Sequence, residues 1–129
     1  MSYQKEYRES IEHPEAFWSR QAELISWFEK PKTILSQDEK GSYHWFKGGK
    51  LNTSYLTLDF HVENGRADQT ALIYDSPVTE TVLRYSFQEL KEEVSKFAGV
   101  LREKGIEKGD RVIIYMPMIP EAVVAMLAC

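Results

Sequence analysis

The chain has 129 residues, which is enough for one small domain or for a part of a larger one. Hydrophobic residues make up 43% and aromatic residues 12%, which predicts a packed core and excludes an intrinsically disordered chain. The net charge of −4 argues against a nucleic-acid partner, because the basic residues are scattered among more numerous acidic ones.

The number of cysteines and the hydropathy pattern indicate the cellular compartment. The single cysteine, Cys129, excludes an internal disulfide and a multi-cysteine metal site. Met1 to Tyr7 is polar and charged, unlike a signal peptide, and no stretch reaches the ~20 apolar residues of a membrane span. We therefore expect a cytoplasmic protein with no membrane partner.

The first predicted element is a helix that starts at Pro14, because proline is tolerated at the first helical position. Its apolar residues recur at spacings of three and four, at Phe17, Trp18, Ala22, Leu24, Ile25 and Phe28. Proline also disfavours a helical conformation in the residue before it, so we expect this helix to end before Pro31.

A polar connector is predicted over Ser36–Ser42, followed by the aromatic cluster Tyr43, Trp45 and Phe46. Gly48-Gly49 signals a turn. A second helix is expected after Asn52, with Leu51, Tyr55, Leu58 and Val62 on one face. Asn64-Gly65 should end it, since both residues tolerate the left-handed conformation.

The pattern changes after residue 65. Two β-prone runs, Thr70–Tyr74 and Val82–Tyr85, flank the turn residues Asp75-Ser76-Pro77 and predict a hairpin. Ser86 and Glu89 form a capping box for a third helix, which Gly105 should end. Leu90, Val94, Phe97, Ala98 and Leu101 are expected to face inward from it.

The continuous apolar run Val112–Met116 predicts a strand buried on both faces, and Pro120 starts a last helix. The order strand, helix, strand predicts a parallel crossover in an α/β sheet. The final eight residues, Ala122–Cys129, are apolar around the whole helix and carry no stop signal. We therefore expect a truncated chain, whose last helix is covered by protein that follows it.

Several segments resemble the acetyl- and propionyl-CoA synthetases, within the adenylate-forming superfamily. The resemblance rests on four stretches that occur in the expected order: Tyr7–Trp18, Trp45–Tyr55, Leu58–Val62 and Gly109–Ala122. The segment Ile73–Thr79 resembles the propionyl branch rather than the acetyl branch.

The resemblance implies residues 1–64 as a helical N-terminal extension and residues 65–129 as the first strands and helices of an incomplete AMP-binding domain. It implies a full-length ligase that uses ATP, Mg²⁺ and CoA to activate a short carboxylate, most simply propionate or else acetate. The acyl group passes through an acyl-adenylate to CoA, releasing pyrophosphate and then AMP. The implied partners are the remainder of the adenylating domain and the C-terminal domain.

The resemblance implies no catalytic, cofactor-binding or metal-binding residue in this chain. The family's Ser/Thr/Gly-rich loop with its lysine, the lysine of its C-terminal domain and its CoA-contacting arginines match no position here. The 129-residue chain is therefore expected to be inactive by itself.

Two turns could be mistaken for phosphate-binding loops. Gly48-Gly49, between Lys47 and Lys50, lacks the longer glycine pattern of such a loop. Met116–Pro120 lies between a predicted strand and helix, but its two prolines remove backbone donors. Both are interpreted as structural turns.

Other reactive or aromatic residues also favour structural roles. The histidines His13, His44 and His61 lack metal-ligand spacing, and Asp59 and His61 cannot face each other across a helix. Cys129 has no basic group placed to activate it. Core or interdomain packing is the favoured role, over ligand stacking, for Trp18, Trp27, Tyr43, Trp45 and Phe46.

Two alternatives to this assignment stay open. The chain could be a free-standing interaction module, whose first helix and aromatic cluster bind a partner protein. It could also belong to an adenylating enzyme for a different carboxylic acid, because nothing in these residues fixes the acyl chain.

Overall fold

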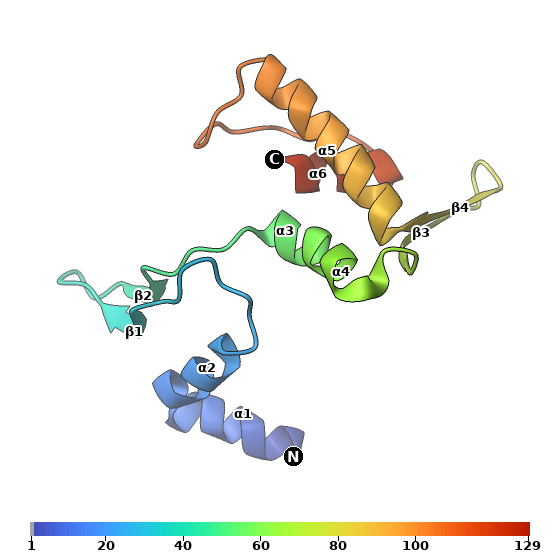
Figure 1. Cartoon of the computed structure of the whole chain (residues 1–129). Coiled ribbons are helices and arrows are strands. Elements are labelled where there is room, and N and C mark those ends of the chain that lie inside the picture. Colours follow the sequence, from blue (N-terminus) through green and yellow to red (C-terminus); the bar gives the residue numbers. More distant parts are fainter. Residues whose placement is uncertain (1) are drawn as a thin grey trace. The chain divides into compact units, whose positions relative to one another are not determined.

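The computed structural model describes residues 2–129 and forms two compact units, Met1–Asn52 and Thr53–Cys129. Helices and strands occur in both units (Figure 1), so the predicted mixture of α and β structure is confirmed. Along the sequence, the boundary between the two units lies between Asn52 and Thr53. The boundary predicted between residues 64 and 65 separates two domains of the family that the sequence resembles. The division into compact units does not test it, so it stays a prediction.

Two helices open the first unit, α1 (Tyr3–Glu12) and α2 (Pro14–Ala22). Helix α1 is not among the predicted elements, although Tyr3, Tyr7 and Ile11 recur at every fourth position. The start of α2 at Pro14 confirms the predicted helix start. The two helices are joined by an ion pair between Arg20 Nη1 and Glu9 Oε1, 2.8 Å apart.

Helix α2 ends at Ala22, so the prediction of a helix that continues to Pro31 is wrong. The Trp27 indole Nε1 donates to the Ala22 carbonyl at 2.8 Å, and the Ile25 peptide N–H donates to it at 3.2 Å. In a continuing helix that carbonyl would accept from the residue four positions later. The indole therefore helps to end the helix by taking its place.

A two-stranded antiparallel sheet follows, built from β1 (Thr33–Gln37) and β2 (Tyr43–Lys47). Part of the predicted connector Ser36–Ser42 is therefore strand, and that prediction is wrong at its first two residues. The turn between the strands is held by Asp38, whose Oδ1 accepts from the peptide N–H groups of Lys40 and Ser42 at 2.9 Å each. This arrangement is an Asx turn, in which a side chain replaces a backbone acceptor.

Gly48-Gly49 forms the predicted turn after β2. Gly48 has φ +82°, and the peptide N–H of Gly49 donates to the Phe46 carbonyl at 3.0 Å. A Cβ added to Gly49 would lie 2.8 Å from Cζ3 of Trp27. Glycine is therefore required here for close packing as well as for the turn.

The second unit begins with three short helical segments: α3 (Thr53–Thr57), α4 (Asp59–His61) and the π-helical turn η1 (Val62–Arg66). The predicted second helix is thus interrupted at Leu58, whose φ and ψ of −120° and −68° are not helical. Its predicted end is confirmed, because Gly65 has φ +76°. The break turns the Leu58 side chain into the core, where it is almost fully buried.

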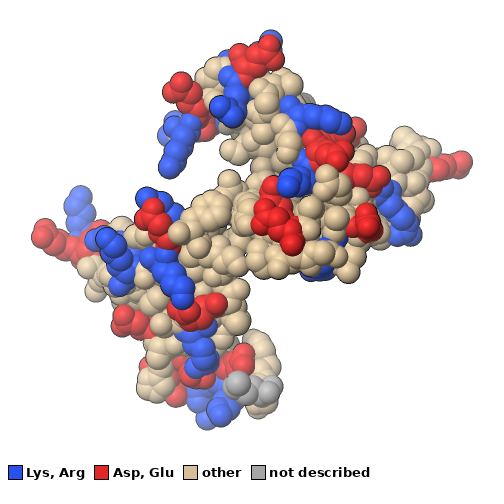
Figure 2. Space-filling view, in the orientation of Figure 1, with Lys and Arg blue, Asp and Glu red and all other residues tan. Residues whose placement is uncertain are grey.

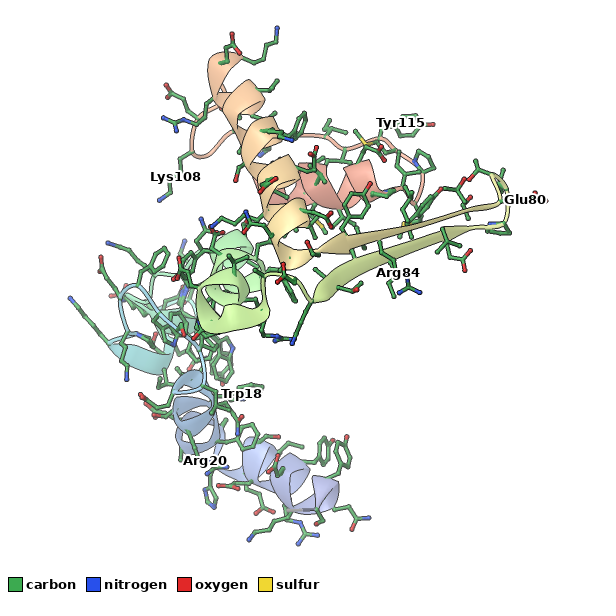
Figure 3. The ribbon with its side chains drawn as sticks, turned by 45° about the vertical axis from the view of Figure 1, so that its right-hand side comes forward. Trp18, Arg20, Glu80, Arg84, Lys108 and Tyr115 are labelled. Carbon is green, nitrogen blue, oxygen red and sulfur yellow. The ribbon has the colours of Figure 1, made fainter. Side chains whose placement is uncertain are left out.

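The predicted hairpin is confirmed as β3 (Thr70–Ser76) and β4 (Thr81–Ser86), which pair in antiparallel fashion. The turn lies at residues 77–80, so its predicted position is wrong for Asp75 and Ser76, which belong to β3. Glu80 lies at its tip (Figure 3) with φ +51°. The predicted third helix is confirmed as α5 (Phe87–Glu103), and its capping box is complete. The Ser86 hydroxyl accepts from the Glu89 peptide N–H at 3.1 Å, and Glu89 Oε2 accepts from the Ser86 peptide N–H at 2.8 Å.

Leu58, Leu90 and Val94 form the core of the second unit, which confirms the inward face predicted for the start of α5. Partly buried residues from the hairpin, the start of α5 and the last helix surround them: Ala71, Leu72, Tyr85, Phe87, Val124, Leu127 and Ala128. The last helix, α6 (Pro120–Ala128), starts at the predicted proline and packs beside α5.

The predicted strand Val112–Met116 and its parallel crossover are wrong for residues 2–129. The chain is extended there but has no ladder, and each of the two sheets is an antiparallel pair, β1 with β2 and β3 with β4. Apolar, β-prone residues predict where strand residues lie. A ladder also needs a neighbouring strand, and neither hairpin supplies one to this segment.

Candidate functional site

The strongest candidate for a functional surface is the extended apolar segment that links α5 to α6, residues 111–119. Ile113 is 91% exposed, Tyr115 99% and Met118 89%. Figure 3 shows Tyr115 projecting away from the helices, and Lys108 in the loop that follows α5. The backbone N–H and C=O groups of this segment are in no ladder, so they can pair with another strand. Its exposed side chains are apolar, which suits docking of another element rather than catalysis.

A groove of about 500 Å³ lies beside the start of this segment. Its apolar lining comes from Val112 and Ile114, from Leu101 near the end of α5, and from Met126 of α6. Its charged lining comes from the end of α5 and the turn after it, at Arg102, Glu107, Lys108 and Asp110. Apolar side chains thus make up most of the lining, as expected of a surface that receives another apolar element.

Helix α6 is covered on one side. Pro120 and Ala125 are buried and Val124 and Leu127 are partly buried, whereas Met126 is 63% exposed. The sequence predicts a helix that is apolar on all sides. Within the described residues, only one side of this apolar helix is covered.

The aromatic residues of the first unit mostly contact one another. Trp27 and Phe46 have ring centroids 5.6 Å apart, Trp45 and Phe46 are 5.9 Å apart, and Trp18 meets the edge of Trp45 at 6.1 Å. Tyr43 instead is mostly exposed. Contacts at these distances are typical of aromatic packing, so the arrangement favours a structural cluster over an open stacking platform.

His44 and His61 each have a polar neighbour within their own unit. His44 Nε2 is 3.0 Å from Asp38 Oδ2, and His61 Nδ1 is 3.1 Å from Arg66 Nη1. Asp59 pairs with Lys91 at 3.0 Å rather than with His61. Among residues 2–129, no three His, Cys, Asp or Glu side chains gather as metal ligands.

In the two turns considered as phosphate loops, the peptide N–H of Gly49 donates to the Phe46 carbonyl at 3.0 Å and that of Ile119 to the Pro117 carbonyl at 2.9 Å. Lys50 Nζ, next to Gly48-Gly49, pairs with Glu29 Oε1 at 2.7 Å. Pro120 opens α6 with no side-chain cap. Cys129 is an exposed free thiol at the end of the last helix.

Several surface interactions that involve a carboxylate shift pKa values. A hydrogen bond from Arg20 lowers the pKa of Glu9, and one from His44 lowers the pKa of Asp38. The hydrogen bond from Tyr55 to the Glu63 carboxylate raises the pKa of Tyr55. None of these pairs lines the apolar groove, so they stabilise local structure and do not mark an acid–base centre there.

One cluster of side chains, around Arg66 and Phe87, is not predicted from the sequence. Arg66 Nε donates to Gln69 Oε1 at 2.7 Å, and its guanidinium lies 5.2 Å from the ring centroid of Phe87. The His61 ring is 4.7 Å from that of Phe87. The two contacts with Phe87 connect η1 and the end of α4 to the start of α5. They join residues more than 20 positions apart, so no local sequence pattern predicts them.

Charges are mixed on the face shown in Figure 2, where lysine and arginine side chains alternate with acidic ones. No helix within residues 2–129 combines the length and apolarity that crossing a bilayer requires.

Comparison with families of known proteins gave two adjacent matches. The model of the acetyl-coenzyme A synthetase N-terminus matches residues 3–57, and the model of the AMP-binding enzymes matches residues 59–129.

Individual relatives agree with these matches. The chain is 49% identical over 127 residues to acyl-CoA synthetase short-chain family member 3, mitochondrial, of Rattus norvegicus, covering 98% of this chain and 19% of that protein. It is 48% identical over 129 residues to acetyl-coenzyme A synthetase of Magnetococcus marinus, covering 98% of this chain and 20% of that protein.

A solved structure is also similar. Acetoacetyl-CoA synthetase from Streptomyces lividans matches with a TM-score of 0.86 and 31% identity, over 99% of this chain and 20% of that one. The chain thus spans about a fifth of the length of the relatives it matches.

Proposed function

Because this chain belongs to the AMP-binding enzymes, and among them to the short-chain acyl-CoA synthetases, we propose that it forms the N-terminal part of an acid–thiol ligase. The observation that supports this most is the order of the two family matches, which cover residues 3–57 and 59–129 with one residue between them.

In the proposed reaction, ATP activates a short carboxylate as an acyl-adenylate and pyrophosphate leaves. The thiol of CoA then attacks the adenylate, and AMP departs. Mg²⁺ would neutralise phosphate charge in the first step. Residues 2–129 contain no cluster of three ligating side chains, and we assign no metal to them. We also propose that this chain alone is inactive, because the family's phosphate loop, its C-terminal lysine and its CoA-contacting arginines match no position here.

The proposed carboxylate is propionate, with acetate as the alternative. The proposal rests on Ile73–Thr79, which resembles the propionyl branch. These residues form most of β3 and the start of the hairpin turn.

The proposed partner of the apolar segment 111–119 and of α6 is the remainder of the adenylating domain, with the C-terminal domain beyond it. The exposed backbone of the segment supports strand pairing with that remainder, and its exposed Ile113 and Tyr115 support burial beneath it. We also propose a cytoplasmic location.

Pyrophosphate exchange by the full-length gene product, with propionate, acetate and butyrate compared, tests the proposal. We expect exchange with all three and the highest kcat/KM with propionate. A higher value for acetate or butyrate would overturn the choice of acid, and no exchange with any carboxylate would overturn the ligase assignment.

The isolated 129-residue chain provides the matched test of inactivity. We expect no exchange from it, and self-association through its exposed apolar segment. A monomer that unfolds cooperatively would instead support the alternative of an independent interaction module.

A further inference from the structure

The peptide that joins Asn64 to Gly65 lies at the surface, at the end of η1. Both residues are exposed and lie where η1 loses helical geometry, with φ and ψ of −98° and 26° at Asn64 and 76° and 22° at Gly65. A Cβ added to Gly65 would meet no atom within 4 Å. No neighbouring side chain therefore packs against Gly65, and the nitrogen that would attack belongs to a residue with no side chain of its own.

We infer that Asn64 is a site of spontaneous deamidation. The Gly65 amide nitrogen loses its proton to solvent and forms a bond to Cγ of Asn64. The bond from Cγ to the side-chain nitrogen breaks, and that nitrogen takes up a proton and leaves as ammonia. Water then adds to either carbonyl carbon of the resulting succinimide, and the bond from that carbon to the Gly65 nitrogen breaks as the nitrogen takes up a proton. Attack at Cγ yields aspartate, and attack at the backbone carbonyl yields isoaspartate.

The chain contains its own control, because its one other asparagine is Asn52. Asn52 is followed by Thr53, the first residue of α3. The branched Thr53 side chain crowds the nitrogen that would have to attack, and a helical residue is less free to rotate. Asn64 is followed by a glycine in open space instead.

Deamidation would change the end of η1. Asn64 Nδ2 donates to the Phe60 carbonyl at 2.6 Å, which links the turn back to α4. An ionised carboxylate only accepts hydrogen bonds, so it would face that carbonyl without a donor. It would also add negative charge beside Glu63 at the carboxyl end of helical structure, where the helix dipole disfavours it. The product should therefore loosen the connection from α4 to β3.

Peptide mass mapping of the purified protein after incubation in mildly alkaline buffer tests the inference. We expect the peptide that contains Asn64 to exchange its amide for a carboxyl, and the peptide that contains Asn52 to keep its amide. Labelling by an isoaspartyl methyltransferase should mark the same peptide. An unchanged Asn64, or equal conversion at the two asparagines, would overturn the inference.

Two variants separate chemistry from structure. Asn64→Gln keeps the amide but would need a larger ring for the same attack, so its peptide should not be labelled. Asn64→Asp reproduces one product and should lower the denaturant midpoint relative to the parent protein. A labelled Asn64→Gln peptide would overturn the succinimide route, and an unchanged midpoint in Asn64→Asp would overturn the loosened turn.

Discussion

Ser86 shows how a single hydroxyl determines where a helix begins. It accepts from the Glu89 peptide N–H at the first turn of α5. Substitution of an N-cap serine by alanine costs about 1 kcal/mol, so Ser86→Ala should lower the free energy of unfolding by about that amount in a urea titration. Ser95→Ala, on the exposed side of the same helix, is the control and should be neutral or slightly stabilising.

Glu89 makes the same cap depend on pH. Hydrogen bonds from the Ser86 backbone and hydroxyl lower the pKa of Glu89. Because its folded pKa is below the unfolded value, the stabilisation is fully present above the unfolded pKa and disappears as the pH falls through the folded one. Unfolding measured across the acid range should show this loss in the parent protein and not in Glu89→Gln; identical profiles would contradict it.

Residues whose roles depend on near neighbours could be predicted from the sequence. The capping box needs only Ser86 and Glu89, three positions apart, and the turn at Gly48-Gly49 needs only two glycines. The contacts of Arg66 with Phe87 could not be predicted, because they depend on how the hairpin returns the chain to η1.

At the scale of elements, the two glycines Gly49 and Gly99 make a matched pair. A Cβ at Gly49 would lie 2.8 Å from the Trp27 ring and 3.1 Å from the Phe46 carbonyl, whereas one at Gly99, within α5, would meet nothing within 4 Å. Gly49→Ala should therefore destabilise the protein by about 1–3 kcal/mol, as overpacking does. Gly99→Ala should stabilise it by about 1 kcal/mol. Urea titration of both variants measures these changes in the free energy of unfolding. A Gly49→Ala variant more stable than the parent protein would contradict the close packing at Gly49.

Elements were predicted well where local signals agree and poorly where a distant contact decides. The hairpin β3–β4 and helix α5 combine turn residues, periodicity and a cap. Helix α2 was predicted too long because the Trp27 indole, five residues after Ala22, accounts for its end. Strands β1 and β2 were not predicted, because Ser36 and Gln37 are polar and were assigned to a connector. The two strands pair because the Asp38 turn between them reverses the chain.

For the whole molecule, Ile113 and Val78 are apolar and 91% and 90% exposed. If segment 111–119 is covered in the full-length protein, Ile113→Asp buries an unpaired charge and should cost about 3–5 kcal/mol. Val78→Asp at the hairpin turn should leave stability nearly unchanged. Thermal unfolding of the two full-length variants is the measurement, and equal midpoints would remove the argument for a covering partner.

The apolar surface could be predicted from the sequence, but its form could not. The residues Val112–Met116 and the helix from Pro120 were recognisable by their apolarity alone. Whether such a run becomes a strand depends on an edge to pair with, and the segment is extended and unpaired within residues 2–129.

The close sequence spacing of the β3–β4 hairpin and α5 has a consequence for biosynthesis. The strands pair across a four-residue turn, and the capping box joins β4 directly to α5. Contacts between residues near in sequence form quickly, since little loop entropy is lost. Thr70–Glu103 can thus gain structure on the ribosome before α6 has emerged, so that later residues meet a surface that is already shaped.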